Sequence, residues 1–320
     1  MSRKLVTVIS VLEEHHRAAI RAAADRWRFE GLFFDREADA LPALADAEIL
    51  FCQSADLAGR APAVKWFCTP FAGVDFLLDI EAFRTGKVLL SNSSGAYGVT
   101  IAEHIVMVIL ETLRRQQDYN GIVLRREWSR GLPVRSIRNS RIVLLGTGDI
   151  GQEAALRLRS FGPSCLTGVN RGGRNPGNLF DRVLQAGDLE TVLPDCDILI
   201  CSLPATPESA GMLDARRLAL LPDEALVVNV GRGSLIDEAA LEKELRTGRL
   251  YAALDVFVRE PLPEDASLWS CPHLLLTPHV AGNMTLPYTR DKIVSLFLED
   301  FENYCTGRPL LRRVNMQLGY

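Results

Sequence analysis

The sequence has no surplus of positive charge. Its 36 Lys and Arg residues are outnumbered by 40 Asp and Glu residues, which gives a formal net charge of −4. A protein that holds a polyanion needs a basic field, and this composition does not supply one. We therefore expect no nucleic-acid partner.

Cysteine pairs of the kind that bind zinc or form a disulfide framework are also lacking. The seven cysteines are scattered, odd in number and never spaced as C-x-x-C. Most lie in apolar stretches such as 197–201, where Cys behaves as a small buried hydrophobe. We expect no metal site and a reducing compartment.

Long apolar runs are absent as well. No stretch approaches the roughly 18 apolar residues of a membrane span. Residues 5–12 are apolar and follow two basic residues, but the run is short, ends in Glu13 and Glu14, and lacks a small-residue cleavage site. It predicts a first strand rather than a signal peptide, so we expect a cytoplasmic protein with no membrane partner.

What the sequence does have is the composition of a folded chain long enough for about two domains. Its 320 residues are 48% hydrophobic and 24% charged, which excludes disorder and a collagen-like repeat. In the first third, short apolar runs alternate with a helical pattern. We predict a helix at 15–28 and strands at 5–12, 48–52, 64–68 and 88–91.

The alternation restarts in the second half of the chain. A long helical pattern covers 100–119, with Thr100 and Glu103 spaced as a capping box, and an Arg-rich connection follows at 120–140. Helical patterns also cover 152–161 and 287–304. We predict six further strands, at 141–145, 165–169, 197–201, 225–230, 251–254 and 274–276. Six strands suit a complete dinucleotide-binding domain.

Strands alternating with helices are typical of parallel βαβ units. We therefore predict an α/β fold of two doubly wound parallel-sheet domains. A Rossmann dinucleotide-binding domain at 100–286 is inserted into a flavodoxin-like substrate domain, made of 1–99 plus 287–320. Because the clearest cofactor signal lies in the middle of the chain, the C-terminal helix must return to the first domain.

A glycine-rich turn carries that cofactor signal. Gly146, Gly148 and Gly151 follow the predicted strand 141–145 at G-x-G-x-x-G spacing and precede a helical pattern. The motif is weak alone and requires this strand-to-helix context. Gly146 permits the tight turn, Gly148 admits a pyrophosphate, and Gly151 allows close helix–strand packing, while the helix start supplies N–H groups. The alternative, an ordinary strand–turn–helix, is disfavoured by three glycines in register.

The next predicted strand lacks the acidic residue that binds the ribose of NAD. Asn170 stands at that place, and Arg171 and Arg174 follow it. A carboxylate would repel a 2′-phosphate, whereas guanidinium groups pair with it, so we expect NADP to be preferred to NAD. The alternative, a pair of solvated loop arginines, carries more weight for Arg174 than for Arg171.

Three chemically versatile residues follow predicted strands near the end of the chain: Arg232, Glu260 and His279. Ligands bind at the carboxyl ends of strands in open parallel sheets. Arg can clamp the carboxylate and carbonyl of a 2-oxo acid, His can give a proton to the oxygen, and Glu can hold the other imidazole nitrogen. Each has an ordinary structural explanation alone, but the three together predict an active site.

Taken with further motifs, these residues make the chain resemble the D-isomer-specific 2-hydroxyacid dehydrogenases over nearly its full length. The matching segments, in the family's order, are 71–75 (FAGVD), 100–104 (TIAEH), 146–151 (GTGDIG), 201–204 (CSLP), 229–237 (NVGRGSLID), 254–257 (LDVF), 260–263 (EPLP), 268–269 (LW) and 277–279 (TPH). The resemblance implies two doubly wound domains hinged around a cleft, and a homodimer formed through the cofactor domain.

The resemblance also implies residue roles. His279 would be the acid/base, Glu260 its partner and Arg232 a substrate ligand. Backbone N–H groups around Ala72, Gly73 and Val74 would hold the substrate carboxylate. The predicted cofactor-binding residues are Gly146, Gly148, Asp149, Ile150, Gly151, Asn170, Arg171, Arg174, Leu203, Pro204, Val230, Gly231, Asp255 (for the nicotinamide carboxamide) and Gly282.

The chain departs from the family's pattern in its substrate loop. Members that act on phosphoglycerate carry arginines after the strand equivalent to 48–52, whereas residues 52–57 here read CQSADL, with one acid and no cation. A phosphorylated substrate would lack its charge partner, so phosphoglycerate is disfavoured. Phe51, Cys52, Phe71 and Tyr97 suggest a small, partly apolar pocket.

We therefore predict NAD(P)H-dependent reduction of a small 2-oxo acid such as glyoxylate, hydroxypyruvate or pyruvate to the D-hydroxy acid. Phosphite oxidation remains an alternative because the same three residues serve it, whereas a formate enzyme of this type has Gln in place of Glu260. A dinucleotide-sensing corepressor is the alternative from another class, although nothing here resembles a peptide-docking appendage. The connection 120–140 has no role in a cofactor fold and favours a homodimer.

Overall fold

The computed structural model describes residues 3–320 and divides them into two compact units. The first comprises the chain up to Tyr97 together with Asn283–Tyr320, and the second is Gly98–Gly282. Each unit contains one all-parallel sheet, so the predicted α/β class with two doubly wound sheets is confirmed. Within residues 3–320, no helix has both the length and the apolar character needed to cross a membrane.

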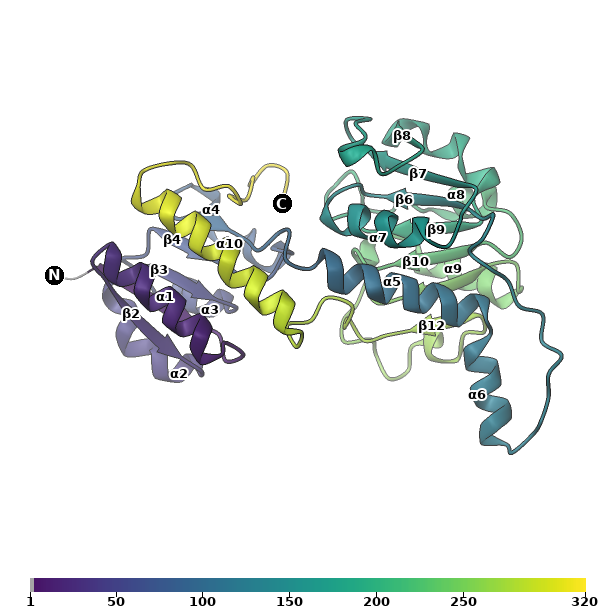
Figure 1. Ribbon diagram of the computed structural model, residues 1–320, viewed down its shortest axis with the longest axis horizontal. Helices are drawn as coiled ribbons and strands as arrows, with labels where there is room; N and C mark the ends of the chain where they lie inside the picture. Colours follow the sequence, from purple (N-terminus) through teal and green to yellow (C-terminus); the bar gives the residue numbers. More distant parts are fainter. Residues whose placement is uncertain (1–2) are drawn as a thin grey trace. The chain divides into compact units, whose positions relative to one another are not determined.

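The sheet of the first unit has the strand order β2-β1-β3-β4-β5, the doubly wound order of flavodoxin. Its strands are β1 (Arg3–Val8), β2 (Phe29–Phe34), β3 (Ala47–Cys52), β4 (Trp66–Cys68) and β5 (Leu89–Ser91). Its helices are α1 (Glu14–Arg26), α2 (Glu37–Ala40), α3 (Ala55–Gly59), α4 (Glu81–Arg84) and α10 (Pro287–Cys305). The C-terminal helix α10 therefore returns to this unit and lies beside α1 (Figure 1).

Aromatic side chains hold α10 on the sheet. Phe297 stacks on Phe51 with ring centroids 4.2 Å apart, and Trp66 stacks on both Phe297 and Tyr304. Phe51, Trp66 and Phe297 are fully buried, and aromatic side chains bury more apolar surface than any others. This packing explains why two segments far apart in the sequence form one unit.

The sheet of the second unit has the order β12-β11-β10-β9-β6-β7-β8, which is the Rossmann order with one strand added at an edge. Its strands are β6 (Arg141–Leu145), β7 (Cys165–Asn170), β8 (Arg182–Gln185), β9 (Ile198–Cys201), β10 (Leu226–Asn229), β11 (Tyr251–Leu254) and β12 (Leu274–Leu276). Its helices are α5 (Gly98–Leu113), α6 (Gln116–Leu124), α7 (Asp149–Arg159), α8 (Ala215–Leu220) and α9 (Glu238–Arg246). Helix α5 packs against α7 on one face of the sheet (Figure 1).

Two strands were missed by the sequence prediction. The second sheet has seven strands rather than six because β8 was not predicted, and β2 of the first sheet was not predicted either. Both are edge strands whose side chains are mostly half-buried or exposed, so neither produces a strong apolar run. The first strand also ends at Val8 and not at residue 12.

The helix predicted at 100–119 is two helices. Helix α5 begins at Gly98 and ends at Leu113, Arg115 adopts the left-handed conformation with φ 57°, and α6 then runs to Leu124. Thr100 therefore lies inside the first turn, so the predicted capping box is wrong. The irregular connection is correspondingly shorter and starts after α6.

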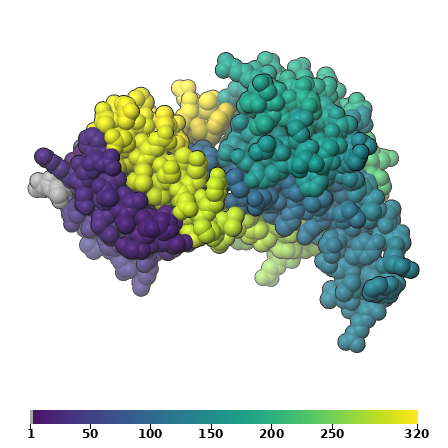
Figure 2. All heavy atoms as spheres, in the orientation of Figure 1, coloured from purple at the N-terminus to yellow at the C-terminus, as the bar shows by residue number. Residues whose placement is uncertain are grey.

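Helix α6 and the connection that follows it project from the second unit (Figures 1 and 2). Residues 127–136 of the connection contain no regular secondary structure. Several apolar side chains on this projection face solvent: Val123 is 69% exposed, Leu124 84% and Trp128 92%. We call α6 and residues 125–136 the arm.

Candidate active site

Arg232, Glu260 and His279 all follow the carboxyl ends of neighbouring strands. Strand β10 pairs with β11, and β11 pairs with β12, all in parallel. Arg232 comes three residues after β10, Glu260 six after β11, and His279 three after β12. Parallel strands present their carboxyl ends at one edge of a sheet, so the three residues share that edge.

The structure joins His279 to Glu260 directly. The Nδ1 atom of His279 lies 2.6 Å from Oε2 of Glu260, and Oε1 of Glu260 accepts a hydrogen bond of 2.9 Å from the backbone N–H of Phe257. That second bond fixes the carboxylate. Because Nδ1 faces Glu260, Nε2 is the ring nitrogen left to meet a substrate oxygen.

Asp255 holds the backbone around His279. Its carbonyl oxygen accepts from the N–H of His279 at 2.9 Å. Its buried carboxylate accepts from the N–H groups of Val280 at 2.9 Å and Ala281 at 3.0 Å, and from the hydroxyl of Thr277 at 2.6 Å. His279 itself has φ 54°, a conformation that side chains rarely adopt. Asp255 thus supports the His279 loop, a role that the sequence did not reveal.

Arg232 is placed by its own turn. The side chain of Asn229 accepts from the N–H of Gly231 at 3.0 Å and donates to the carbonyl of Arg232 at 2.9 Å. The Arg232 Nη1 donates to the carbonyl of Gly231 at 2.8 Å. Sheet order puts this turn one strand from Glu260, on the edge that carries the His279–Glu260 pair.

The glycine-rich turn fits a dinucleotide pyrophosphate. It joins β6 to α7 where the strand order reverses, which is the ligand-binding position of doubly wound sheets. A Cβ on Gly151 would lie 2.1 Å from the carbonyl oxygen of Gly146, whereas one on Gly148 would meet no atom within 4 Å. Gly148 also begins α7 without a side-chain cap. Close packing on one side and open space beside uncapped N–H groups are what anion binding requires.

Two loops of the predicted cofactor site touch each other. A Cβ on Gly231 would lie 2.6 Å from the carbonyl oxygen of Leu203, so the turns after β9 and β10 are in contact. The carbonyl of Pro204 accepts from the Ser209 hydroxyl at 2.7 Å, and the N–H of Val230 donates to the carbonyl of Cys201 at 3.0 Å.

Three further predicted cofactor residues of the second unit are Asp149, Ile150 and Gly282. A Cβ on Gly98 would lie 2.5 Å from a carboxylate oxygen of Asp149, so that carboxylate sits at the start of α5. An acid is favoured there by the helix dipole. Ile150 occupies the first turn of α7, and Gly282 is the last residue of the second unit.

Asn170 organises the loop after β7. Its amide nitrogen donates to Thr147 Oγ1 at 2.6 Å and to the carbonyl of Arg174 at 2.8 Å, while its oxygen accepts from the N–H of Gly172 at 3.0 Å. Asn170 therefore ties the glycine-rich turn to the 171–174 loop. Arg171 and Arg174 are both exposed on that loop.

The three predicted carboxylate-binding residues form a cluster of free donors in the first unit. Among residues 3–320, no protein group accepts a hydrogen bond from the N–H of Ala72, Gly73 or Val74. Asn92 fixes the turn by donating to the carbonyl of Ala72 at 2.7 Å, and Tyr97 does so by donating to that of Pro70 at 2.8 Å. Successive unpaired N–H groups make an anion-binding concavity.

The expected apolar pocket is wrong in part. Phe51 and Cys52 are fully buried in the core of the first unit and Tyr97 is nearly so, which leaves Phe71 as the half-buried member. Phe51 lies on β3, which is buried along its whole length, and its ring stacks on Phe297 of α10.

One cluster of metal-ligating side chains occurs within residues 3–320, away from this site: His15, His16 and Asp291. The N–H of Glu13 donates to His16 Nδ1 at 3.1 Å, so the proton of a neutral ring lies on Nε2, which donates to Asp291 at 2.8 Å. Hydrogen bonds from His15, at 3.2 Å, and from His16 lower the pKa of Asp291. A metal would have to displace that proton, so we assign the cluster a structural role joining α1 to α10.

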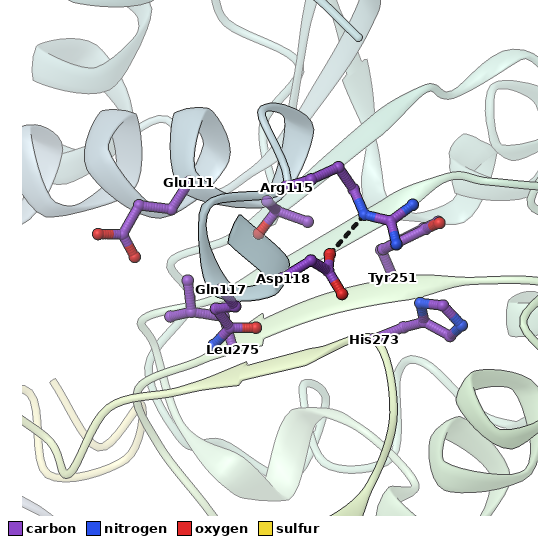
Figure 3. Close-up of a pocket in the computed structure, with 8 residues that line it drawn as sticks. Glu111, Arg115, Gln117, Asp118, Tyr251, His273 and Leu275 are labelled. Atoms are coloured by element: carbon purple, nitrogen blue, oxygen red, sulfur yellow. Dashed lines mark hydrogen bonds and ion pairs between the residues drawn. The ribbon is translucent and has the colours of Figure 1, made fainter. Parts of the chain in front are cut away.

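A small pocket lies at the other edge of the second sheet (Figure 3). It is lined by residues of α5 and α6 and by Tyr251, His273 and Leu275, which belong to or border β11 and β12. Two of its lining residues, Arg115 and Asp118 at the start of α6, form an ion pair of 2.6 Å. None of the predicted site residues lines this pocket, so it is separate from the candidate active site.

Comparison with known proteins identifies the class. Residues 106–281 match the model of the family described as D-isomer specific 2-hydroxyacid dehydrogenase, NAD binding domain. The chain is 29% identical to glyoxylate/hydroxypyruvate reductase B of Serratia proteamaculans over 91% of both chains. It is 30% identical to glyoxylate/hydroxypyruvate reductase B of Yersinia pestis, over 91% of this chain and 90% of the other.

Solved structures agree. A D-isomer specific 2-hydroxyacid dehydrogenase family protein from Aeromonas salmonicida has a TM-score of 0.87 at 31% identity, with 99% of this chain and 100% of that chain covered. An NADPH-dependent glyoxylate/hydroxypyruvate reductase from Sinorhizobium meliloti, solved with NADP and sulfate, has a TM-score of 0.83 at 26% identity, with 99% and 100% covered. The chain belongs to the D-isomer specific 2-hydroxyacid dehydrogenase family, and it is an NAD(P)-dependent oxidoreductase.

Proposed function

We propose that this protein reduces a small 2-oxo acid to the D-2-hydroxy acid, with His279 as the acid, Glu260 as its partner and Arg232 as a substrate ligand. The observation that carries the proposal is the 2.6 Å contact between His279 Nδ1 and Glu260 Oε2 at the carboxyl edge of the cofactor-type sheet. The relatives named glyoxylate/hydroxypyruvate reductase support glyoxylate and hydroxypyruvate as the first acids to test.

The reaction needs one hydride and one proton. The nicotinamide, when bound, supplies the hydride to the carbonyl carbon of the acid. His279 Nε2 gives its proton to the carbonyl oxygen as that oxygen gains negative charge. The Glu260 carboxylate stabilises the protonated imidazole before transfer, and the Phe257 N–H keeps the carboxylate in place. Arg232 draws the carbonyl oxygen and carboxylate into one orientation through its planar guanidinium.

The substrate carboxylate is assigned to the N–H groups of Ala72, Gly73 and Val74. Three successive donors without a protein acceptor among residues 3–320 support this assignment. We accordingly assign binding of the substrate carboxylate to the first unit, and binding of the dinucleotide to the second.

We also propose that NADPH is preferred to NADH. The loop after β7 offers two exposed guanidinium groups, Arg171 and Arg174, and has the neutral Asn170 at the end of the strand. The glyoxylate/hydroxypyruvate reductase structure from Sinorhizobium meliloti contains NADP, and a D-isomer specific 2-hydroxyacid dehydrogenase structure from Xanthobacter autotrophicus contains NADPH. The test is the ratio of kcat/KM for NADPH to that for NADH, which should exceed one and fall when Arg171 and Arg174 are both changed to Ala. A ratio at or below one in the unaltered protein would refute the preference.

A homodimer formed through the second unit is the proposed assembly. The exposed apolar side chains of the arm support it, since monomers rarely leave large side chains such as Trp128 so open to solvent. We further propose a reducing, cytoplasmic location. All seven cysteines are free, which fits a reducing compartment. Burial raises the pKa of Cys52, Cys68 and Cys196 to about 12, which keeps these thiols protonated at neutral pH.

The decisive experiment for the proposed function is a matrix of acids against cofactors. Glyoxylate, hydroxypyruvate, pyruvate and 3-phosphohydroxypyruvate would each be tested with NADPH and NADH, with oxidation of the cofactor followed by absorbance. We expect turnover of one or more of the first three acids and little of the phosphorylated acid, because the loop at 52–57 has no cation. Tight cofactor binding without turnover of any acid would refute the proposal.

A further inference from the structure

His104 lies on a helix that packs against β10 and β11, the strands that precede Arg232 and Glu260. It occupies the second turn of α5, where its side chain is only 10% exposed. Its Nε2 atom lies 3.4 Å from Thr277 Oγ1 and 4.0 Å from Asp255 Oδ1. The side chain therefore reaches Asp255 and Thr277, the first residues after β11 and β12.

The hydrogen-bond directions in this cluster follow from its geometry. Asp255 is an acceptor, so the Thr277 hydroxyl donates its only proton to Asp255 Oδ1, at 2.6 Å. The hydroxyl oxygen can then only accept from His104. His104 Nε2 must carry a proton, which makes a chain of donors from His104 through Thr277 to Asp255.

Burial supports a neutral ring at this position. Removal from water lowers the pKa of His104 below its ordinary value, although the carboxylates of Asp255 and Glu111 act in the opposite direction. A neutral imidazole with its proton on Nε2 completes the chain without placing a buried positive charge there.

Asp255, the last member of this series of hydrogen bonds, holds the backbone around His279 in place. Asp255 accepts from the N–H groups of Val280 and Ala281 through its carboxylate, and from that of His279 through its carbonyl. His279 holds a left-handed backbone conformation, which persists only where the surroundings enforce it. A small rotation of the Asp255 carboxylate would release two of these three bonds.

We propose that His104 is a positioning residue for His279: by donating to the Thr277 hydroxyl, it fixes the Asp255 carboxylate that clamps the backbone of 279–281. The inference rests on the proposed function of His279 as the acid. The rate of proton donation by His279 then depends on His104, although α5 contributes no predicted site residue.

The test compares His104→Leu, which removes the donor, with His104→Gln, which retains an N–H donor. For His104→Leu we expect kcat to fall roughly ten- to hundredfold, because small misplacements of reacting groups have effects of that size. KM for the acid and the Kd for NADPH should stay within about twofold, since His104 is not among the residues proposed to bind either ligand. His104→Gln should recover most of kcat.

His273→Asn, at the opposite edge of the same sheet, is the matched control and should retain kcat.

A second readout needs no turnover. Hydrogen exchange at the amides of 279–281 should become faster in His104→Leu and return toward the original rate in His104→Gln. Thr277→Val, which removes the hydroxyl with little change of shape, should reproduce the Leu variant and replaces it if that variant does not fold. Unchanged exchange, or a Gln variant as impaired as the Leu variant, would overturn the inference. If the unaltered protein reduces no acid, the proposed function fails and the exchange rates alone decide the role of His104.

Discussion

Glu260 shows how a single side chain gains its role from its two neighbours. One oxygen accepts from the Phe257 N–H and the other faces His279, so the carboxylate has one orientation. Its charge as well as its shape should therefore matter for proton donation.

Glu260→Gln keeps the size of the side chain and removes its charge. The amide oxygen can still accept from the imidazole, but the amide nitrogen cannot accept from the Phe257 N–H, and the negative charge that stabilises the protonated imidazole is lost. We expect kcat for reduction to fall by about tenfold to a hundredfold, within the range of general acid catalysis, while NADPH affinity is kept. Steady-state kinetics with a cofactor titration check this. An unchanged kcat would show that the charge of Glu260 is not used.

Gly148 offers a test of the glycine-rich turn that leaves the fold intact. An added Cβ meets no protein atom within 4 Å, and φ is −75°, which Ala adopts readily. The methyl group would instead occupy the space assigned to the pyrophosphate. We expect Gly148→Ala to keep its melting temperature but to bind NADPH about ten- to hundredfold more weakly, the effect of 1–3 kcal/mol of steric conflict.

Gly59→Ala is the control, because it too meets no atom within 4 Å and lies in the first unit. It should change neither property. Equal NADPH affinity in Gly148→Ala and the unaltered protein would mean that the cofactor does not approach this turn.

The sequence was most informative about residues whose role depends on strand order. His279 and Glu260 follow adjacent strands, and parallel pairing alone brought them together. The roles of Asn92 and Thr277 could not be predicted. Each depends on a side-chain orientation toward a distant backbone group, and a single polar residue after a strand gives no signal of that orientation.

At the scale of elements, a charged cluster joins two strands to the C-terminal helix. Glu48 on β3 accepts from Arg3 on β1, at 2.7 and 3.0 Å, and from the Tyr304 hydroxyl of α10 at 2.9 Å. The hydrogen bond from Arg3 is the largest cause of the lowered pKa of Glu48. Because the folded-state pKa lies below the unfolded one, the cluster stabilises the fold above the ordinary Glu pKa and loses this effect as pH falls.

Glu48→Gln should therefore destabilise the protein at neutral pH by about 1.5–3 kcal/mol, the usual contribution of a hydrogen bond to a charged group. The difference from the unaltered protein should begin to shrink below about pH 4, where the carboxylate of the unfolded state becomes protonated, and should vanish once the pH falls below the lowered folded-state pKa as well. Urea unfolding at several pH values measures this, with the exposed Glu264→Gln as control. A difference that does not depend on pH would contradict the assigned role of the charge.

The sequence prediction missed secondary-structure elements and breaks where the apolar pattern is weak or no breaker residue marks the end of a helix. The strands β2 and β8 lie at sheet edges with partly exposed faces, so their apolar runs are weak. The break between α5 and α6 depends on the left-handed backbone of Arg115 and its contact with Asp118, and neither residue is a helix breaker by type. Strands β6 and β9 were predicted to within one residue because each contains an uninterrupted run of four buried apolar residues, preceded in β6 by one exposed arginine.

At the scale of the whole molecule, the arm is the feature that the two sheets do not require. If it mediates homodimerisation, then replacing its exposed aromatic side chain should weaken the assembly. We expect the unaltered protein to sediment as a dimer of about twice 35.4 kDa at micromolar concentration, and Trp128→Ser to shift toward the monomer.

The exposed Trp269, in a short turn of the second unit, provides the control as Trp269→Ser. A monomer in the unaltered protein would contradict the assignment of the arm, without affecting the proposed chemistry.

The central claim is that the imidazole of His279 donates the proton in reduction of a 2-oxo acid. The most direct measurement is the rate of glyoxylate reduction by NADPH in the unaltered protein and in His279→Gln, with NADPH affinity determined in parallel. Turnover that falls by roughly 10²- to 10⁴-fold in the variant, at unchanged NADPH affinity, is the predicted result. A variant that turns over glyoxylate as fast as the unaltered protein would contradict it.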